Sequence, residues 1–237
     1  MRLLRASLPD RPAADAALAA VLLVRAQQEP LLRISRPAPT VGFGRLDRIR
    51  PGFAAAMTAA RAHGFEPVLR QPGGHAAAYH HGSVVLEVVG TAADPVAGMR
   101  GRFGWAAETI AAALRACGVD ARVGAVPGEY CAGEFSVNGA GRVKLAGIAQ
   151  RVVRRAWMVG AEVVVEDGEP VRRVLADVYA ARELDVDVAT AAAVEELAPG
   201  VGVDDVERAL VEAFGVTSRV PLTPDLVEAA AAKADQG

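Results

Sequence analysis

Apolar residues in the first half of the chain recur with two spacings, one typical of helices and one typical of strands. Two of the helical segments are followed by a glycine, Gly64 and Gly118, a residue that commonly closes a helix. Helices are predicted at residues 12–28, 51–63 and 101–116, and strands at residues 31–35, 40–45, 65–69 and 76–89. Helices and strands therefore do not alternate regularly.

The second half begins with a strand-rich stretch and ends with helices. Strands are predicted at residues 135–137, 142–149 and 157–166, with short glycine-containing turns between them. Turns of this length cannot hold a crossover helix, so we expect neighbouring strands to be antiparallel. After Asp167 the pattern is helical to the end of the chain. The sequence predicts an α+β fold in which helices flank a mixed, largely antiparallel sheet.

Capping residues mark three of the helix starts. Asp10 is expected to cap the helix that begins near Pro12. Asp204 and Glu207 have the spacing of a capping box, and Thr223 stands before a proline, as at the start of a last helix.

The N-terminal segment resembles a signal peptide only loosely. Basic residues precede an apolar run at 16–24, but Asp10, Arg11 and Asp15 interrupt the segment. The run is also short for a membrane span. We therefore expect an ordinary first helix and no membrane partner.

Composition narrows the class of protein. A chain of 237 residues suits one large domain, and 52% apolar residues can supply its core. The net charge of -2 gives no bulk basic field, which argues against binding to nucleic acid or an anionic membrane. Two cysteines in different contexts do not make a disulfide framework, so we expect a reducing, cytoplasmic location.

Cys131 and Lys144 are the residues that most suggest chemistry. Lysine is rare in this chain, since only Lys144 and Lys233 contribute to its 26 basic residues. A thiol can carry an acyl group as a thioester, and an ammonium group can stabilise the charge that builds on a carbonyl oxygen. Cys131 stands in a glycine-containing loop, where a thiol can be reactive, whereas Cys117 ends a helix and is expected to pack in the interior.

A second candidate segment runs from Arg70 to Gly82. Gly73 and Gly74 allow a backbone to approach a ligand closely, and the alanines after them leave room for a slender chain. Arg70 could face an anionic or carbonyl-bearing group. Taken alone, the segment is equally compatible with an ordinary hairpin turn.

Histidines do not form a convincing metal site. His63 lies on a different predicted element, and His75, His80 and His81 share one short loop without a carboxylate or thiol at ligand spacing. We expect no metal. The chain also has neither a Walker-type phosphate loop nor a GxSxG nucleophile elbow.

Together these segments resemble the lipoate/octanoate protein ligase and transferase superfamily, which is related to biotin protein ligases. The glycine-rich pattern R-x-x-G-G-x-A-x-x-H is matched by Arg70, Gly73, Gly74, Ala76 or Ala77, and His80. The lysine motif K-x-x-G-x-A/S-Q-R is matched by Lys144, Gly147, Ala149, Gln150 and Arg151. Weaker matches are the first strands, at 31–33 and 41–45, and the opening helix motif at 15–18, in which alanine replaces the usual glutamate.

The segment from Glu129 to Ser136 distinguishes the branches of this superfamily. It resembles the S-Y-C-P-G-x-x-D/S stretch of the cysteine-dependent octanoyltransferases and amidotransferases. ATP-dependent lipoate ligases typically lack this cysteine and often have an additional C-terminal domain. The resemblance implies a catalytic domain at residues 1–215, with residues 216–237 as a helical tail of the same domain.

The resemblance also implies roles for particular residues. Cys131 and Lys144 would be catalytic, and His80 is a candidate for positioning or proton transfer. The substrate-binding candidates are Arg70, Gly73, Gly74, His75, Ala76, Ala77, His80, Gly147 and Ala149. An octanoyl or lipoyl group would pass through a Cys131 thioester to a lysine of a lipoyl-domain protein. Such acceptors are the 2-oxoacid dehydrogenase E2 subunits and the glycine-cleavage H protein, and acyl carrier protein is a possible donor.

Two alternatives stay open at this point. In an ATP-dependent lipoate ligase, ATP and magnesium would be needed and Cys131 would be incidental. In a non-catalytic paralogue, the chain would bind acyl groups or lipoyl domains without transfer. The chain departs from the family patterns at Gln71, Pro72, His81 and Ala132, which leaves the substrate open.

Overall fold

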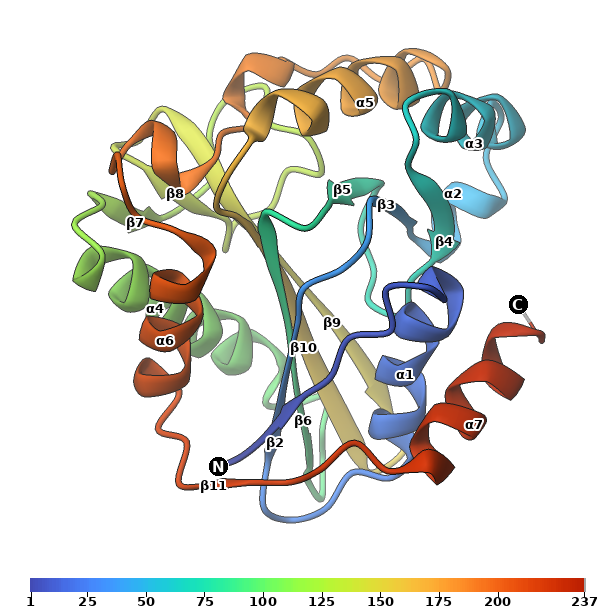
Figure 1. Cartoon of the computed structure of the whole chain (residues 1–237), viewed down its shortest axis with the longest axis vertical. Helices are drawn as coiled ribbons and strands as arrows, with labels where there is room; N and C mark the ends of the chain where they lie inside the picture. The colour runs from blue at the N-terminus through green and yellow to red at the C-terminus, as the bar shows by residue number, and fades with distance from the viewer. Residues whose placement is uncertain (237) are drawn as a thin grey trace.

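The computed structural model describes residues 1–236 and contains one large sheet, one small sheet and helices packed around them (Figure 1). The strand order of the eight-stranded sheet is β11-β1-β2-β6-β10-β9-β8-β7. Its strands are β1 Arg2–Arg5, β2 Leu31–Ser35, β6 Ser83–Thr91, β7 Ala121–Val123, β8 Val137–Gly139, β9 Val143–Val153, β10 Ala156–Val164 and β11 Ser218–Arg219. β1 is parallel to both of its neighbours, and all other neighbours in this sheet are antiparallel.

The small sheet has the order β4-β3-β5, with β3 parallel to β4 and antiparallel to β5. Its strands are β3 Thr40–Phe43, β4 Glu66–Leu69 and β5 Ala77–Tyr79. The helices are α1 Pro12–Val24, α2 Arg45–Arg48, α3 Phe53–Ala62, α4 Met99–Ala116, α5 Gly168–Ala180, α6 Val203–Ala213 and α7 Pro224–Ala234. Two short 3₁₀ helices, Val188–Thr190 and Val194–Glu196, follow α5.

Three apolar clusters hold these layers together. The largest packs α4 and α6 against the large sheet, the second joins the small sheet to α3 and α5, and the third joins α1 and α7 to strand ends. Figure 1 shows the same division, with α4 and α6 on one side, α3 and α5 at the top, and α1 beside α7. Cys131 packs at the edge of the second cluster, so the candidate site lies next to the small sheet.

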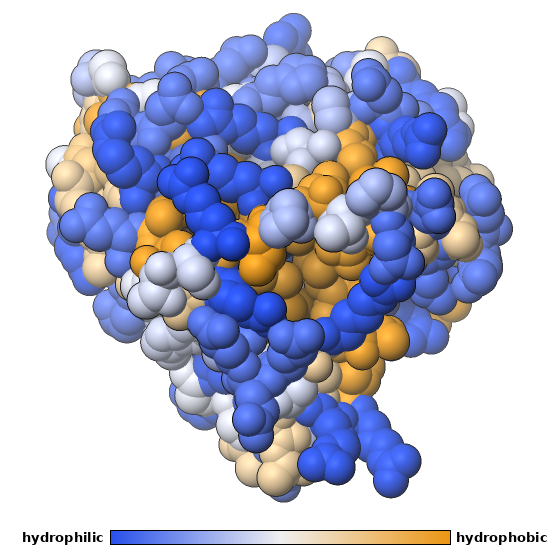
Figure 2. Space-filling model, turned by 60° about the horizontal axis from the view of Figure 1, so that its bottom comes forward, coloured by the Kyte–Doolittle hydropathy of each residue, from blue (hydrophilic) through white to orange (hydrophobic). Residues whose placement is uncertain are grey.

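The face of the molecule drawn in Figure 2 is mostly polar although the composition is apolar. Figure 2 shows that apolar residues gather in one central area of the viewed face and that hydrophilic residues border them. The large apolar side chains that are exposed are Val24, Leu46, Ile49, Val96 and Trp105. Among residues 1–236, no helix combines the length and apolarity that crossing a membrane requires.

The predicted fold class is confirmed, as is the antiparallel order of the strands after residue 121. Several details were wrong, among them the short strand β7, which was not predicted. The first helix stops at Val24, not at residue 28. Strands β1 and β11 were missed, because each is short and depends on pairing between the two ends of the chain. The short helix α2 was also missed.

The predicted caps are corrected at two of three helices. The N-cap of α1 is Arg11, with no capping side chain, so Asp10 does not have the predicted role. The N-cap of α6 is Gly202, whose N–H donates to Asp205 at 3.1 Å. Glu207 instead pairs with Arg5 of β1 and with Arg36, which directly follows β2. Thr223 caps α7 as predicted, accepting a hydrogen bond from the Leu226 N–H at 3.4 Å.

Candidate functional site

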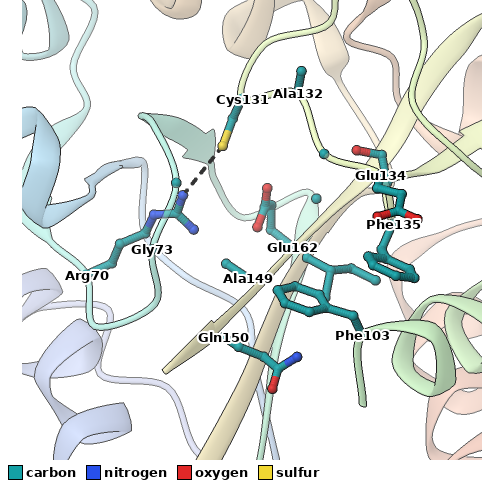
Figure 3. Close-up of a pocket in the computed structure, with 15 residues that line it drawn as sticks. Arg70, Gly73, Phe103, Cys131, Ala132, Glu134, Phe135, Ala149, Gln150 and Glu162 are labelled. Carbon is teal, nitrogen blue, oxygen red and sulfur yellow. Dashed lines mark hydrogen bonds between the residues drawn. The ribbon is translucent and has the colours of Figure 1, made fainter. Parts of the chain in front are cut away.

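A cavity of about 280 Å³ brings together segments that are far apart in the sequence (Figure 3). Strands β9 and β10 contribute one wall, and the loops around Gly73 and Cys131 contribute the others. The lining residues are Arg70, Gly73, Gly74, Phe103, Cys131, Ala132, Gly133, Glu134, Phe135, Ser136, Gly147, Ile148, Ala149, Gln150 and Glu162. Six predicted site residues are therefore in one cavity: Arg70, Gly73, Gly74, Cys131, Gly147 and Ala149.

The sulfur of Cys131 faces two donors from the glycine loop. The His75 N–H donates to Cys131 Sγ at 3.1 Å, and Arg70 Nη2 lies 3.9 Å from the same sulfur. Arg70 is fixed in this position because Nη2 also donates to the His75 carbonyl oxygen at 2.7 Å. Cys131 has φ 43, a left-handed conformation that is uncommon for a residue with a side chain. Strain of this kind persists only where the surroundings hold the backbone in place.

Lys144 and Glu129 hold the backbone of the cysteine loop. Lys144 Nζ donates to the carbonyl oxygens of Tyr130 and Cys131, both at 2.9 Å, and lies 3.5 Å from Glu129 Oε1. The Glu129 carboxylate accepts hydrogen bonds from Val126 N–H at 3.0 Å and Gly133 N–H at 3.1 Å. The Ser136 hydroxyl donates to the same carboxylate at 2.6 Å. The ion pair therefore explains how Cys131 is kept in its left-handed conformation.

The position of Lys144, outside the cavity lining, bears on its expected role in stabilising an oxyanion. Its side chain is 1% exposed and lies behind the loop, outside the set of cavity-lining residues. An ammonium group has three N–H donors, and here they have two carbonyl oxygens and a carboxylate as partners. To stabilise an oxyanion directly, Lys144 would have to leave at least one of these partners.

Two glycines allow the close packing of charged and reactive groups. A Cβ atom at Gly74, where φ is +94, would lie 2.8 Å from Cys131 Sγ and 2.9 Å from Arg70 Nη2. A Cβ atom at Gly147 would lie 2.5 Å from Glu162 Oε1. Real Cβ atoms do not approach so closely, so a side chain at either position would displace the sulfur or the carboxylate.

Glu162 adds a buried carboxylate to the cavity and was not among the predicted site residues. It lies on β10, opposite Gly147 on β9, and is 7% exposed. Burial raises the pKa of Glu162 above its ordinary value, while the nearby charges of Arg70 and Lys144 act in the opposite direction. A charged residue in the otherwise apolar run 156–164 was a signal that sequence reasoning could have used.

Four predicted substrate-binding residues do not line the cavity. The His75 ring is directed to Asp47, with Nδ1 3.1 Å from Oδ1. Ala76 and Ala77 are buried in the second apolar cluster. His80 Nδ1 accepts from the Gly82 N–H at 2.8 Å, and its Nε2 lies 2.9 Å from the Asp167 carbonyl oxygen, so both ring nitrogens have backbone partners.

The register of the glycine-rich pattern explains the position of His80. When the pattern is counted from Arg70, its final histidine falls nine residues later, on Tyr79. Adjacent side chains of a strand point to opposite faces, so a shift of one residue changes the face. Tyr79, at the end of β5, lies beside Arg70, whose charge opposes the rise that burial causes in the pKa of Tyr79.

Within residues 1–236, no group of three or more His, Cys, Asp or Glu side chains is placed to hold a metal ion. Tyr179 of α5, which was not among the predicted site residues, donates to the Ala76 carbonyl oxygen at 2.9 Å and also contacts the Cys131 backbone. This tyrosine therefore links the cysteine loop to the strand that follows the glycine loop.

Comparison with known proteins gives one family match and several similar folds. The model of the lipoyl protein ligase A/B catalytic domain matches residues 12–215. No curated protein matches the chain. The fold is similar to that of a lipoate-protein ligase A bound with ATP, at TM-score 0.78 and 21% identity, covering 99% of this chain and 94% of that one.

Two structures from Thermoplasma acidophilum have the same fold. One is a protein with bound lipoic acid, at TM-score 0.78 and 20% identity, covering 99% of this chain and 94% of that one. The other is a bipartite lipoate protein ligase described with its E2 lipoyl domain, at TM-score 0.76 and 21% identity, covering 99% and 92%. At these identities the likeness establishes the fold.

The fold is that of a lipoate-protein ligase catalytic domain. The chain belongs to the lipoyl protein ligase A/B catalytic-domain family. The family predicted from the glycine-rich and lysine motifs is therefore confirmed.

Proposed function

We propose that this protein transfers an octanoyl or lipoyl group through a thioester on Cys131. The observation that carries the proposal is the position of the Cys131 sulfur, at the wall of the cavity and 3.1 Å from a backbone donor. Arg70 places a positive charge beside the same sulfur. Two donors are therefore directed at the sulfur that would attack an acyl carbonyl.

The first step forms the thioester. The Cys131 sulfur attacks the carbonyl carbon of an acyl donor, a new C–S bond forms, and the bond from that carbon to the donor's sulfur or nitrogen breaks. The thiol proton leaves with the donor group. The His75 N–H and Arg70 are the donors best placed to stabilise the carbonyl oxygen during this step.

Lys144 is proposed to act through the loop that it holds. Its contacts with the carbonyl oxygens of Tyr130 and Cys131 fix the backbone on both sides of the reactive sulfur. We therefore assign it a positioning role, which differs from the direct oxyanion contact expected from the sequence. Loss of Lys144 would move the sulfur relative to Arg70.

An ATP-dependent ligase is the runner-up, because a similar fold is bound with ATP. The charges of this cavity favour the transferase. Its lining has one arginine, Arg70, and two carboxylates, Glu134 and Glu162, whereas polyphosphates are bound by clusters of positive charge and backbone N–H groups. ATP and magnesium belong to the mechanism only if the ligase alternative holds.

Lipoyl-domain proteins are the proposed acceptors, since a similarly folded ligase is described with its E2 lipoyl domain. The 2-oxoacid dehydrogenase E2 subunits and the glycine-cleavage H protein are such acceptors, and acyl carrier protein is a proposed donor. A nucleophilic thiol requires a reducing compartment, which is consistent with the free state of Cys117 and Cys131.

Intact-mass analysis tests this function. Incubation with octanoyl donors, without ATP, should add one octanoyl mass that hydroxylamine removes and that maps to Cys131. Cys131→Ser should abolish this adduct or replace it by a more stable ester, and Cys117→Ala should leave it intact. Acylation that requires ATP and survives Cys131→Ala would establish the ligase alternative. Binding of donors without modification of any lipoyl domain would establish the non-catalytic one.

A further inference from the structure

Glu162 is a buried carboxylate whose oxygens are directed into the cavity. It is 7% exposed, and no other residue among 1–236 donates a hydrogen bond to its side chain in this structure. Figure 3 shows the carboxylate of Glu162 and the guanidinium of Arg70 on either side of the space below the Cys131 sulfur. The donor to this carboxylate is its own backbone N–H, so the hydration lost on burial is only partly replaced. The position is therefore costly unless a ligand supplies the missing donors.

The other polar side chains of the cavity already have partners. Gln150 accepts from Arg102 and donates to the Met99 carbonyl oxygen. Glu134 is exposed and pairs with Arg100. Glu162 is thus the acceptor that remains available to a reactant, and a carboxylate accepts hydrogen bonds from N–H groups.

The acyl chain and the acceptor lysine differ in the hydrogen-bond donors that they can bring to Glu162. An octanoyl or lipoyl chain has no N–H donor, whereas the acceptor lysine brings an ammonium group. That ammonium must lose a proton before its nitrogen can attack a thioester, since the ordinary pKa of lysine is about 10.4. Lys144 is not directed at an incoming lysine, because its Nζ donates to the carbonyl oxygens of Tyr130 and Cys131 behind the loop.

We propose that Glu162 binds the ε-ammonium group of the acceptor lysine and takes up its proton, so that the lysine can attack the Cys131 thioester. This inference rests on the proposed function and names the residue that serves its second step. The proposal also explains the glycine at position 147, because a side chain there would collide with the Glu162 carboxylate.

A proton passes from the lysine ammonium to Glu162, giving a neutral amine and a carboxylic acid. The amine nitrogen forms a bond with the thioester carbonyl carbon, and the C–S bond breaks. Cys131 leaves as a thiolate and receives the second proton from the new amide nitrogen, which restores its thiol. Glu162 then releases its proton to water.

Several charged and titratable groups act on the pKa of Glu162. Arg70 from the glycine loop and Lys144 from β9 favour its charged form, and burial opposes it. Tyr79 from β5 and Tyr130 from the cysteine loop are also within electrostatic range. Burial raises the pKas of both tyrosines, so they remain neutral where a lysine acceptor would be deprotonated.

The test separates the two steps in the full chain. Octanoyl-Cys131 enzyme is prepared from the parental protein and from Glu162→Gln, and the transfer of the acyl group to a lipoyl domain is followed by mass at several pH values. Thioester formation should be unchanged within about twofold, whereas transfer to lysine at pH 7 should fall about 100-fold. The deficit should shrink as pH rises toward about 10, because the free amine becomes abundant without a base.

A second nucleophile and a matched variant make the test specific. Hydroxylamine is unprotonated at neutral pH, so it should cleave the thioester equally fast in both proteins. Glu207→Gln is the control, because it removes a buried carboxylate, 4% exposed, on α6 and outside the cavity. Equal transfer to lysine by Glu162→Gln at pH 7, or a deficit that is constant with pH, overturns the inference while the thioester mechanism stands. Absence of any thioester would instead refute the proposed function.

Discussion

Replacing Lys144 with methionine tests whether the ion pair with Glu129 holds the cysteine loop. Both side chains are buried, at 1% and 0% exposure, and their charged atoms are 3.5 Å apart. Removing one partner of a buried pair leaves the other charge without compensation, which typically costs about 3–5 kcal/mol. The variant also loses two hydrogen bonds to loop carbonyl oxygens. We expect Lys144→Met to lower the free energy of unfolding by about 3–5 kcal/mol.

Urea unfolding followed by circular dichroism measures this change. For a chain of this length, a loss of about 3–5 kcal/mol corresponds to a decrease in Tm of roughly 6–20 °C. Glu129→Gln removes the carboxylate charge that Lys144→Met leaves without a partner. The stability lost in the double variant should therefore be smaller than the sum of the losses in the two single variants, by at least about 1 kcal/mol. Lys233→Met, at an exposed position of α7, is the matched control and should have no measurable effect.

Two outcomes would refute this reasoning. The first is a Lys144→Met protein as stable as the Lys233→Met control. The second is a double variant whose loss equals the sum of the single losses, because additivity would mean that the two groups do not interact. In either case Lys144 would not hold the loop, and its direct contact with the acyl carbonyl would become the better explanation of any loss of turnover.

Further predictions concern the thiols, the cavity wall and the titration of Glu162. Burial raises the pKa of the Cys117 thiol, so iodoacetamide at neutral pH should label Cys131 first, and Cys131→Ser should remove most of the early label by peptide mapping. Gly147→Ala should slow transfer to lysine more than thioester formation in step-resolved assays, because its methyl group would displace the Glu162 carboxylate. Lys144→Arg should restore little of the activity lost in Lys144→Ala, about 100-fold in both, because the planar fork places its donors differently. The pKa of Glu162 is raised by burial from 4.5, so its protonation stabilises the fold at low pH, and this contribution is lost as pH rises through the folded-state pKa. Glu162→Gln should therefore gain stability relative to the parental protein as pH increases above about 4.5, measured by unfolding at several pH values.

The sequence was sufficient for the parts of the fold that depend on local signals. Short glycine turns predicted the antiparallel strands after residue 121, and Gly64 and Gly118 marked the ends of two helices. Strand β1 could not be predicted in the same way, because it is four residues long and is stabilised by parallel pairing with β2 and β11. The capping box expected at Glu207 failed for a similar reason, since contacts with distant arginines determine the position of that side chain.

In the candidate site, sequence motifs predicted which segments come together but not the direction in which each side chain points. Arg70, Gly74, Cys131 and Gly147 were selected from motifs, and the structure places all four in one cavity. Spacing could not determine whether the Lys144 ammonium faces that cavity or the backbone behind it. The pairing of β8 with β9 contains a register shift next to Asn138, the partner of Lys144, and such an irregularity changes the direction in which side chains point.

Two of the four departures from the family patterns, Gln71 and Pro72, lie together at a place that bears on substrate choice. Gln71 and Pro72 line a smaller hollow of about 40 Å³, which shares Arg70 and Glu162 with the main cavity. Pro72 packs close to β10, since a Cβ atom at Gly160 would lie 3.1 Å from its Cγ. The residues proposed to act on the thioester carbonyl match the family patterns, whereas these two differ on the far side of Arg70. A change confined to that side would alter the space available to the acyl group and leave the sulfur and its donors in place.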